Sequence, residues 1–194
     1  MALFYVTGLP GAGKSAVLDE LRARGYHARG VDEDGYADWI NLATGTHDRF
    51  PEDDPDLDFH AWYQDHNWVL SARRIGILSR ATARLGQPVF LCGVADEDRT
   101  VWHLFAKVLA LVADAPTLKH RIVTRENNQF GKAPEELNAV LESQVGYEAS
   151  YRGFGAAIID AARPLSQVVD DVLAASFALP GSEEAPERAR ILPR

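Results

Sequence analysis

The chain has 194 residues with 46% apolar and 25% charged side chains, a composition typical of one globular domain with a substantial core. Its 28 acidic and 20 basic side chains give a net charge of −8, which argues against partners held by bulk positive charge. We therefore expect no nucleic acid and no membrane among its partners. A lone Cys92, and the absence of a basic segment leading into an apolar one, predict a cytoplasmic protein.

An apolar run predicts a first strand at about residues 3–7, and residues 8–15 then read Gly-Leu-Pro-Gly-Ala-Gly-Lys-Ser. This is the pattern G-x-x-x-x-G-K-[ST] of a P-loop, placed between a strand and a helix as that motif requires. Its glycines allow backbone N–H groups to converge on a phosphate, and the following helix adds its positive end. The nucleotide-binding residues expected here are Gly8, Gly11, Ala12, Gly13, Lys14, Ser15 and Ala16.

The helix after the P-loop should end near Gly25, and an extended segment at residues 26–31 leads to Asp32-Glu33-Asp34. Residues 41–58 are polar and acidic, which predicts a surface insertion or flap. Spaced apolar residues then predict a helix from His60 to Leu85, with Trp62 on its inner face. His60 and His66 are six apart, which is not a metal-ligand spacing on one helix face, so we expect no zinc site.

The rest of the chain again alternates strands with helices. The sequence predicts strands at residues 89–92, 108–112 and 156–159. It predicts helices at residues 96–105, from Asp114 through the region of Arg121 and Arg125, from Pro134 to about Tyr151, and from Leu165. Residues 127–132 form a polar loop, and the tail after Leu179 has few apolar residues and is expected to be disordered.

This alternation predicts a three-layer α/β/α fold, a P-loop NTPase fold with a mostly parallel sheet of about five strands. We expect one domain over residues 1–179, with an acceptor-binding insertion at 36–74, a lid at 121–133 and a disordered tail at 180–194. Ligands of such folds bind at the carboxyl ends of the strands. The P-loop, Asp32, Asp34 and the loop beginning at Gly93 all follow strands and should meet there.

Over residues 1–177 the chain resembles the small P-loop kinases, the group of shikimate, gluconate and adenylate kinases. The resemblance rests on the P-loop, on Asp32-Glu33-Asp34, on a lid-like stretch at residues 121–132 and on an adenine-loop-like stretch at 159–165. The chain departs from shikimate kinases in following Gly93 with Val94 and Ala95 rather than two more glycines. It also lacks the Gly-x-Pro-Arg of adenylate kinases and an Asp at the end of the strand at 89–92.

The resemblance implies that ATP donates its γ-phosphoryl group to a hydroxyl of a small molecule, with Mg²⁺ as cofactor. Lys14, Arg121 and Arg125 would clamp the phosphates, and Ser15 and Asp32 would hold Mg²⁺. Asp34 would accept the proton of the acceptor hydroxyl or only orient it. Arg163 would stack on adenine or simply begin a helix.

The small-molecule acceptor is expected to bind at Asp34, Trp39, Trp68, Arg73 and Gly93. Because residues 34–58 carry many carboxylates and one Arg, Arg49, we expect a neutral or cationic acceptor with a hydroxyl and a ring face. Alternatively, the acidic stretch is a solvated flap that faces away from the site. Two further functions remain open: a nucleotide-dependent switch or ATPase without an acceptor, and a nucleotide-binding domain without chemistry.

Overall fold

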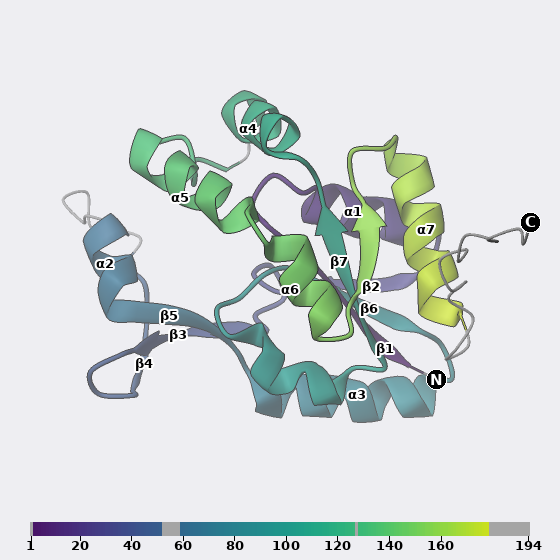
Figure 1. Ribbon diagram of the computed structural model, residues 1–194. Coiled ribbons are helices and arrows are strands. Elements are labelled where there is room, and N and C mark those ends of the chain that lie inside the picture. Colours follow the sequence, from purple (N-terminus) through teal and green to yellow (C-terminus); the bar gives the residue numbers. More distant parts are fainter. Residues whose placement is uncertain (1, 52–58, 127, 179–194) are drawn as a thin grey trace, which may run out of the picture.

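A five-stranded parallel sheet forms the centre of the molecule (Figure 1). The computed structural model describes residues 2–51, 59–126 and 128–178. The strands lie in the order β2-β6-β1-β7-β8, and every neighbouring pair is parallel. Their bounds are β1 Leu3–Gly8, β2 His27–Gly30, β6 Val89–Cys92, β7 Lys107–Val112 and β8 Ala157–Asp160.

Helices cover both faces of this sheet and create two separate cores. Alternate residues of β1 point to opposite faces, so Phe4 and Val6 join one buried cluster and Leu3 and Tyr5 join the other. The first cluster includes α1 (Lys14–Ala23) and α7 (Leu165–Phe177), and the second includes α3 (Ala72–Leu85), the short 3₁₀ helix η1 (Asp98–Leu104) and α6 (Tyr147–Gly153). The predicted three-layer α/β/α fold is therefore confirmed.

A second, antiparallel sheet projects from the main body beside α2, as Figure 1 shows at the left. It consists of β3 (Ala37–Asn41), β4 (His47–Asp48) and β5 (His66–Leu70), and α2 spans Phe59–Asp65. The single helix predicted from His60 to Leu85 was wrong, because residues 66–70 pair with β3 and Ser71 caps a new helix by accepting a hydrogen bond from the Arg74 N–H. Apolar residues at mixed spacing fit a helix and a strand equally well over so short a run.

The long helix predicted from Pro134 to Tyr151 was also wrong. It is divided into α5 (Pro134–Gln144) and α6, because Gly146 adopts a φ of 80° that ends one helix and precedes the next. The helix predicted after Asp114 is confirmed as α4 (Ala115–Thr124), whose first turn is capped by Asp114 through the Thr117 N–H at 2.9 Å. In the described part of the chain, no helix combines the length and apolar character needed to cross a membrane.

Two predicted segments lie wholly or partly outside the described residues. The acidic flap is described only as far as residue 51, where its first part is the β3–β4 hairpin. The tail at 180–194 lies outside the described residues altogether.

Candidate active site

A cavity of about 790 Å³ lies at the carboxyl ends of the parallel strands. The P-loop, the turn after β2, the loop after β6, helices α4 and α5 and the second sheet all contribute to its walls. A cavity of this size suits a nucleotide together with a small organic molecule. The convergence of separate loops at this edge of the sheet is the one that the sequence predicted.

The backbone of the P-loop is shaped by two glycines in the left-handed region, Gly11 at a φ of 84° and Gly13 at 101°. Both line the cavity, and Gly13 caps the N-terminus of α1. Gly8 differs, because it ends β1 without a positive φ and an added Cβ would lie 2.8 Å from the Leu111 carbonyl oxygen. Neither Gly8 nor the buried Ala12 lines the cavity, so both support the loop from behind.

Lys14 is held inside its own loop. Its Nζ donates hydrogen bonds to the carbonyl oxygens of Gly8, at 2.7 Å, and Leu9, at 3.1 Å. Burial lowers the pKa of Lys14 to about 8, Asp32 opposes this shift and the positive charge of Arg125 reinforces it. The protein therefore neutralises little of the positive charge of Lys14, and an anion in the cavity would be attracted to it. Ser15 and Ala16 follow it in the first turn of α1 and also line the cavity.

Arg121 of α4 and Arg125, the residue that follows this helix, line the same cavity. Arg121 donates from Nη2 to the Ala161 carbonyl oxygen at 2.9 Å and reaches the Ala12 carbonyl oxygen at 3.5 Å. Arg125 donates to the Phe130 carbonyl oxygen, but its buried Nε makes no hydrogen bond within the described residues. Burial lowers the pKa of the Arg125 guanidinium. Together with Lys14, these side chains concentrate positive charge beside the P-loop.

The two carboxylates predicted after β2 point to different places. Asp32 lines the cavity and accepts a hydrogen bond from the Trp68 indole Nε1 at 3.0 Å. Burial raises the pKa of Asp32, and Trp68 and Lys14 act against this shift.

The prediction that Asp34 faces the acceptor was wrong. Its carboxylate accepts from the Gly30 N–H at 2.8 Å and pairs with Arg22 and Arg29, which holds it on the turn beside β2 and α1. It is not among the residues that line the cavity.

Three other predicted site residues also lie outside the cavity walls. Arg73 is exposed on α3, where its neighbour Ser71 has just begun the helix. Gly93 packs against Val31, and a Cβ at Gly93 would lie 2.3 Å from the Val31 Cβ, so this glycine permits close packing. Arg163 pairs with Asp171 and donates to Gln167 at 3.2 Å on α7.

The aromatic residues predicted to contact the acceptor do line the cavity. Trp39 and Trp68 are cross-strand partners in the second sheet with ring centroids 5.1 Å apart, and Tyr63 lies 6.0 Å from Trp39. These three rings form one side of the cavity.

Sequence reasoning missed Asp96, the cavity residue that organises these rings. One carboxylate oxygen accepts from the Tyr63 hydroxyl at 2.8 Å and the other from the Trp68 backbone N–H at 2.7 Å. Asp96 lies three residues beyond Gly93, in the loop that follows β6. Its position after a parallel strand was the available signal, because side chains in such loops reach the ligand-binding edge.

The fold of this chain is similar to those of several solved proteins. The fold is similar to that of an unliganded sugar kinase from Janibacter sp. HTCC2649, at 17% identity over 89% of this chain and 92% of that chain, with a TM-score of 0.52. It is also similar to shikimate kinase from Acinetobacter baumannii in complex with shikimate, at 11% identity over 92% and 96% of the two chains, with a TM-score of 0.53. The chain has the fold of the P-loop small-molecule kinases. No family model matches the chain. No curated protein sequence matches it either.

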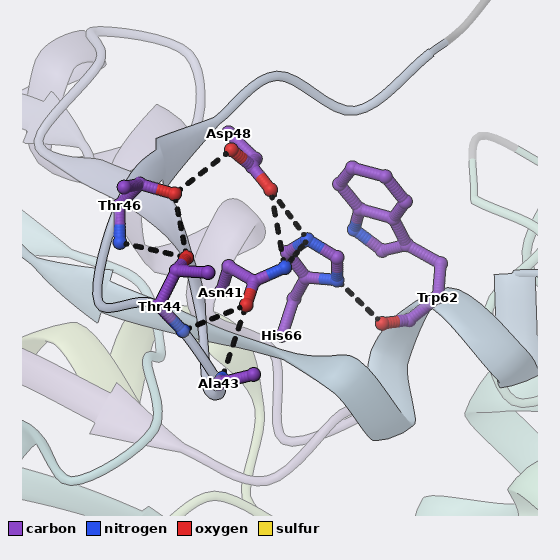
Figure 2. A network of polar contacts seen from close by, with 7 residues as sticks. All are labelled: Asn41, Ala43, Thr44, Thr46, Asp48, Trp62 and His66. Carbon is purple, nitrogen blue, oxygen red and sulfur yellow. Dashed lines mark hydrogen bonds and ion pairs between the residues drawn. The ribbon is translucent and has the colours of Figure 1, made fainter.

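Within this kinase fold, a polar network links the strands of the second sheet to α2 (Figure 2). Both ring nitrogens of the buried His66 have partners at 2.9 Å, Nε2 the Asp48 carboxylate and Nδ1 the Trp62 carbonyl oxygen. The Trp62 ring stacks on the His66 ring with centroids 3.7 Å apart and also contacts Trp39. Trp62 was predicted to be a core residue, and the structure places it in this smaller cluster on the second sheet.

Proposed function

We propose that this protein transfers the γ-phosphoryl group of ATP to a hydroxyl group of a small molecule, with Mg²⁺ as cofactor. The observation that carries the proposal is the shared cavity, in which Lys14, Arg121 and Arg125 face the same space as Asp32. Phosphoryl transfer needs a cation clamp, a metal and a positioned acceptor more than it needs covalent chemistry. Two solved proteins of this fold are named as kinases, of sugar and of shikimate, which supports the same class of reaction.

The P-loop residues suit a nucleoside triphosphate. The left-handed Gly11 and Gly13 leave backbone N–H groups without Cβ atoms in front of them, and an added Cβ at Gly13 would come no closer than 3.8 Å to another residue, Arg121. Such a concavity at the start of α1 is suited to the phosphates. The Lys14 ammonium, which donates only to loop carbonyls, would reorient toward the β- and γ-phosphates.

Ser15 and Asp32 would hold Mg²⁺, since both line the cavity beside Lys14 and offer the oxygen ligands this cation prefers. When bound, the metal supplies charge neutralisation between the β- and γ-phosphates. Arg121 and Arg125 would neutralise the remaining charge as it moves to the transferred group.

Asp32 is also the best-placed proton acceptor for the hydroxyl. It interacts with Lys14 on one side and is hydrogen-bonded by Trp68 on the other, so it lies where the phosphates and the aromatic rings meet. This assignment replaces Asp34 in that role.

The test follows the label from γ-labelled ATP in the presence of Mg²⁺ and pools of hydroxyl-bearing metabolites. Label should move onto an organic acceptor with the wild type, and Lys14→Met should lower the rate about a hundredfold or more because the clamp loses its central charge. Lys119→Met is the matched control, because Lys119 is exposed on α4 and lines no cavity. Label appearing only as inorganic phosphate, at a rate no pool changes, would favour the alternative of an ATPase or switch.

A further inference from the structure

The side of the cavity opposite the P-loop has a distinct chemistry that narrows the choice of acceptor. Resting on the proposed function, we infer that the acceptor is cationic: a hydroxyl-bearing ring compound that carries an ammonium group. The inference concerns one surface, which we call the aromatic–acidic wall and define by five cavity-lining residues: Asp32, Trp39, Tyr63, Trp68 and Asp96.

The wall is a single connected unit. Trp68 donates from its indole to Asp32 and from its backbone N–H to Asp96, and Tyr63 donates its hydroxyl to Asp96. Trp39 contacts the rings of both Trp68 and Tyr63. The rings and the carboxylates therefore hold one another in place, and a ligand would meet both kinds of group at once.

The wall offers a ligand more hydrogen-bond acceptors than donors. The Trp68 indole and the Tyr63 hydroxyl already donate to the two carboxylates. Each carboxylate has about four lone-pair positions, so Asp96, which is not assigned to the metal, can still accept from a ligand. An ammonium group donates three hydrogen bonds and accepts none, and it is attracted to the faces of Trp and Tyr rings.

Positive charge in the cavity lies elsewhere. Among the described residues that line it, the cations are Lys14, Arg121 and Arg125, which come from the P-loop and the end of α4. The arginines close to the wall in sequence have other partners: Arg29 pairs with Asp34, Arg74 pairs with Asp38 on β3, and Arg99 lies over the Phe154 ring. Arg73 does not line the cavity. A carboxylate or phosphate on the acceptor that lay against this wall would thus face Asp96, whose hydrogen-bond donors, the Tyr63 hydroxyl and the Trp68 N–H, carry no charge.

Three probes that share a trans-4-hydroxycyclohexyl unit test the inference, since their second substituent differs in charge. They are trans-4-aminocyclohexanol, trans-cyclohexane-1,4-diol and trans-4-hydroxycyclohexanecarboxylate, which are cationic, neutral and anionic at pH 7. Binding of each probe to the wild type, loaded with Mg²⁺ and a non-hydrolysable ATP analogue, is measured by ligand-observed NMR titration. We expect the amine to bind at least about tenfold more tightly than the diol, and the carboxylate to bind most weakly.

Variants assign the preference to the wall. Asp96→Asn should remove most of the difference between amine and diol, while Glu97→Gln, the same change at the exposed next residue outside the cavity, should leave it intact. Trp39→Leu keeps both carboxylates and should weaken amine binding more than diol binding. It provides a second test if Asp96→Asn does not fold, which thermal unfolding of each variant would show.

The outcomes separate the inference from the proposed function. If the diol binds as tightly as the amine, or the carboxylate binds most tightly, the cationic acceptor is wrong, even when the ATP analogue binds and phosphate is transferred. If the amine binds selectively but the ATP analogue does not bind at all, the kinase proposal fails and an amine site remains. An amine preference that survives Asp96→Asn and Trp39→Leu would place the cation away from the wall and overturn the inference.

Discussion

The two sides of the cavity are built in different ways. The phosphate end is built largely by one short segment: Gly11, Gly13, Lys14 and Ser15 are nearly consecutive, and they are joined by Arg121 and Arg125 from a distant part of the chain. The aromatic–acidic wall is all side chains, drawn from the turn after β2, from the second sheet with α2, and from the loop after β6. The phosphate end is thus specified by local backbone geometry, and the wall by tertiary packing.

This difference predicts which changes each side tolerates. Substitutions at the phosphate end should alter nucleotide handling while leaving the wall in place, because its loop is closed by its own hydrogen bonds, such as Ala12 N–H to Leu9 carbonyl at 3.0 Å. Substitutions that displace β5 or the loop after β6 should affect the acceptor and spare ATP. Four experiments test that separation, beginning with the largest expected effect.

Arg125→Ala should lower kcat by about a hundredfold or more and change the KM for ATP only slightly. The positive charge of Arg125 is expected to stabilise mainly the transition state, where negative charge shifts. Removing one such donor typically lowers kcat by about 10²–10³. Steady-state kinetics measures both constants, and Arg125→Lys, which keeps the charge but loses the contact geometry, should recover part of the rate. A raised KM for ATP at unchanged kcat would make Arg125 a binding residue instead.

Gly93→Ala should destabilise the fold by about 1–3 kcal/mol, because the new methyl group has no room beside Val31. Gly93 lies between Val31, which precedes Asp32, and the loop that carries Asp96, so the added volume pushes the two carboxylates apart. Amine binding should weaken more than affinity for the ATP analogue, because Asp96 belongs to the wall, whereas the atoms nearest to the added methyl group belong to Val31 and not to the P-loop that holds the phosphates.

The matched control for that substitution is Gly76→Ala on α3. There an added Cβ would meet only the Arg80 side chain at 3.5 Å, an ordinary contact, and alanine should stabilise the helix by about 1 kcal/mol. Thermal and denaturant unfolding compare the two. Equal stability of the two variants would show that the packing of Gly93 on Val31 is not tight.

ATP affinity should fall as pH rises through about 8, by up to about tenfold per pH unit. The cause is Lys14, whose pKa is lowered to about 8: below that pH the ammonium is present to meet the phosphates, and above it the neutral amine predominates. Calorimetric titration of an ATP analogue from pH 7 to 9.5 gives the profile. Lys14→Met should bind weakly at every pH with no such slope, and a slope that persists in this variant would assign the titration to another group.

The same contrast explains what the sequence could predict. The P-loop, the alternation of strands with helices that predicts a parallel sheet, and the position of α4 follow from local patterns, and they agree with the structure. Asp32 and Asp34 have the same side chain two residues apart, and Asp34 turns away because it accepts from the Gly30 N–H and pairs with Arg22 and Arg29, contacts that no sequence motif marks.

Residues 66–70 show a second reason why part of the site could not be predicted, which is that it depends on pairing between distant segments. Their strand pairing depends on β3, a segment some thirty residues earlier, and the apolar spacing alone does not distinguish a strand from a helix over so short a run. Asp96 was missed because its contacts, with Tyr63 and Trp68, exist only once that second sheet forms. Side-chain sites assembled from distant segments lack a local pattern, whereas the P-loop has one.

The smallest expected effect concerns His66, which lies behind the wall. Burial lowers the pKa of His66, but the hydrogen bonds with Asp48 and the Trp62 carbonyl outweigh it and raise the pKa above its usual value near 6.5. Both ring nitrogens face acceptors at 2.9 Å, so only the protonated ring donates to both. A raised folded-state pKa means that the stabilisation is complete below about pH 6.5 and is lost as pH rises through the folded value.

His66→Gln should therefore lower the melting temperature by a few degrees at most at pH 5.5, and by less at pH 8.5. Amine binding should weaken slightly in the same direction, because the Trp62 ring that stacks on His66 also supports Trp39. Affinity for the ATP analogue at pH 7 should not change, since none of these groups lines the phosphate end. A melting-temperature difference that is constant or larger at high pH would show that the neutral imidazole is the form that holds the sheet. A parallel loss of ATP affinity would show that the two sides of the cavity are coupled, against the separation argued from how they are built.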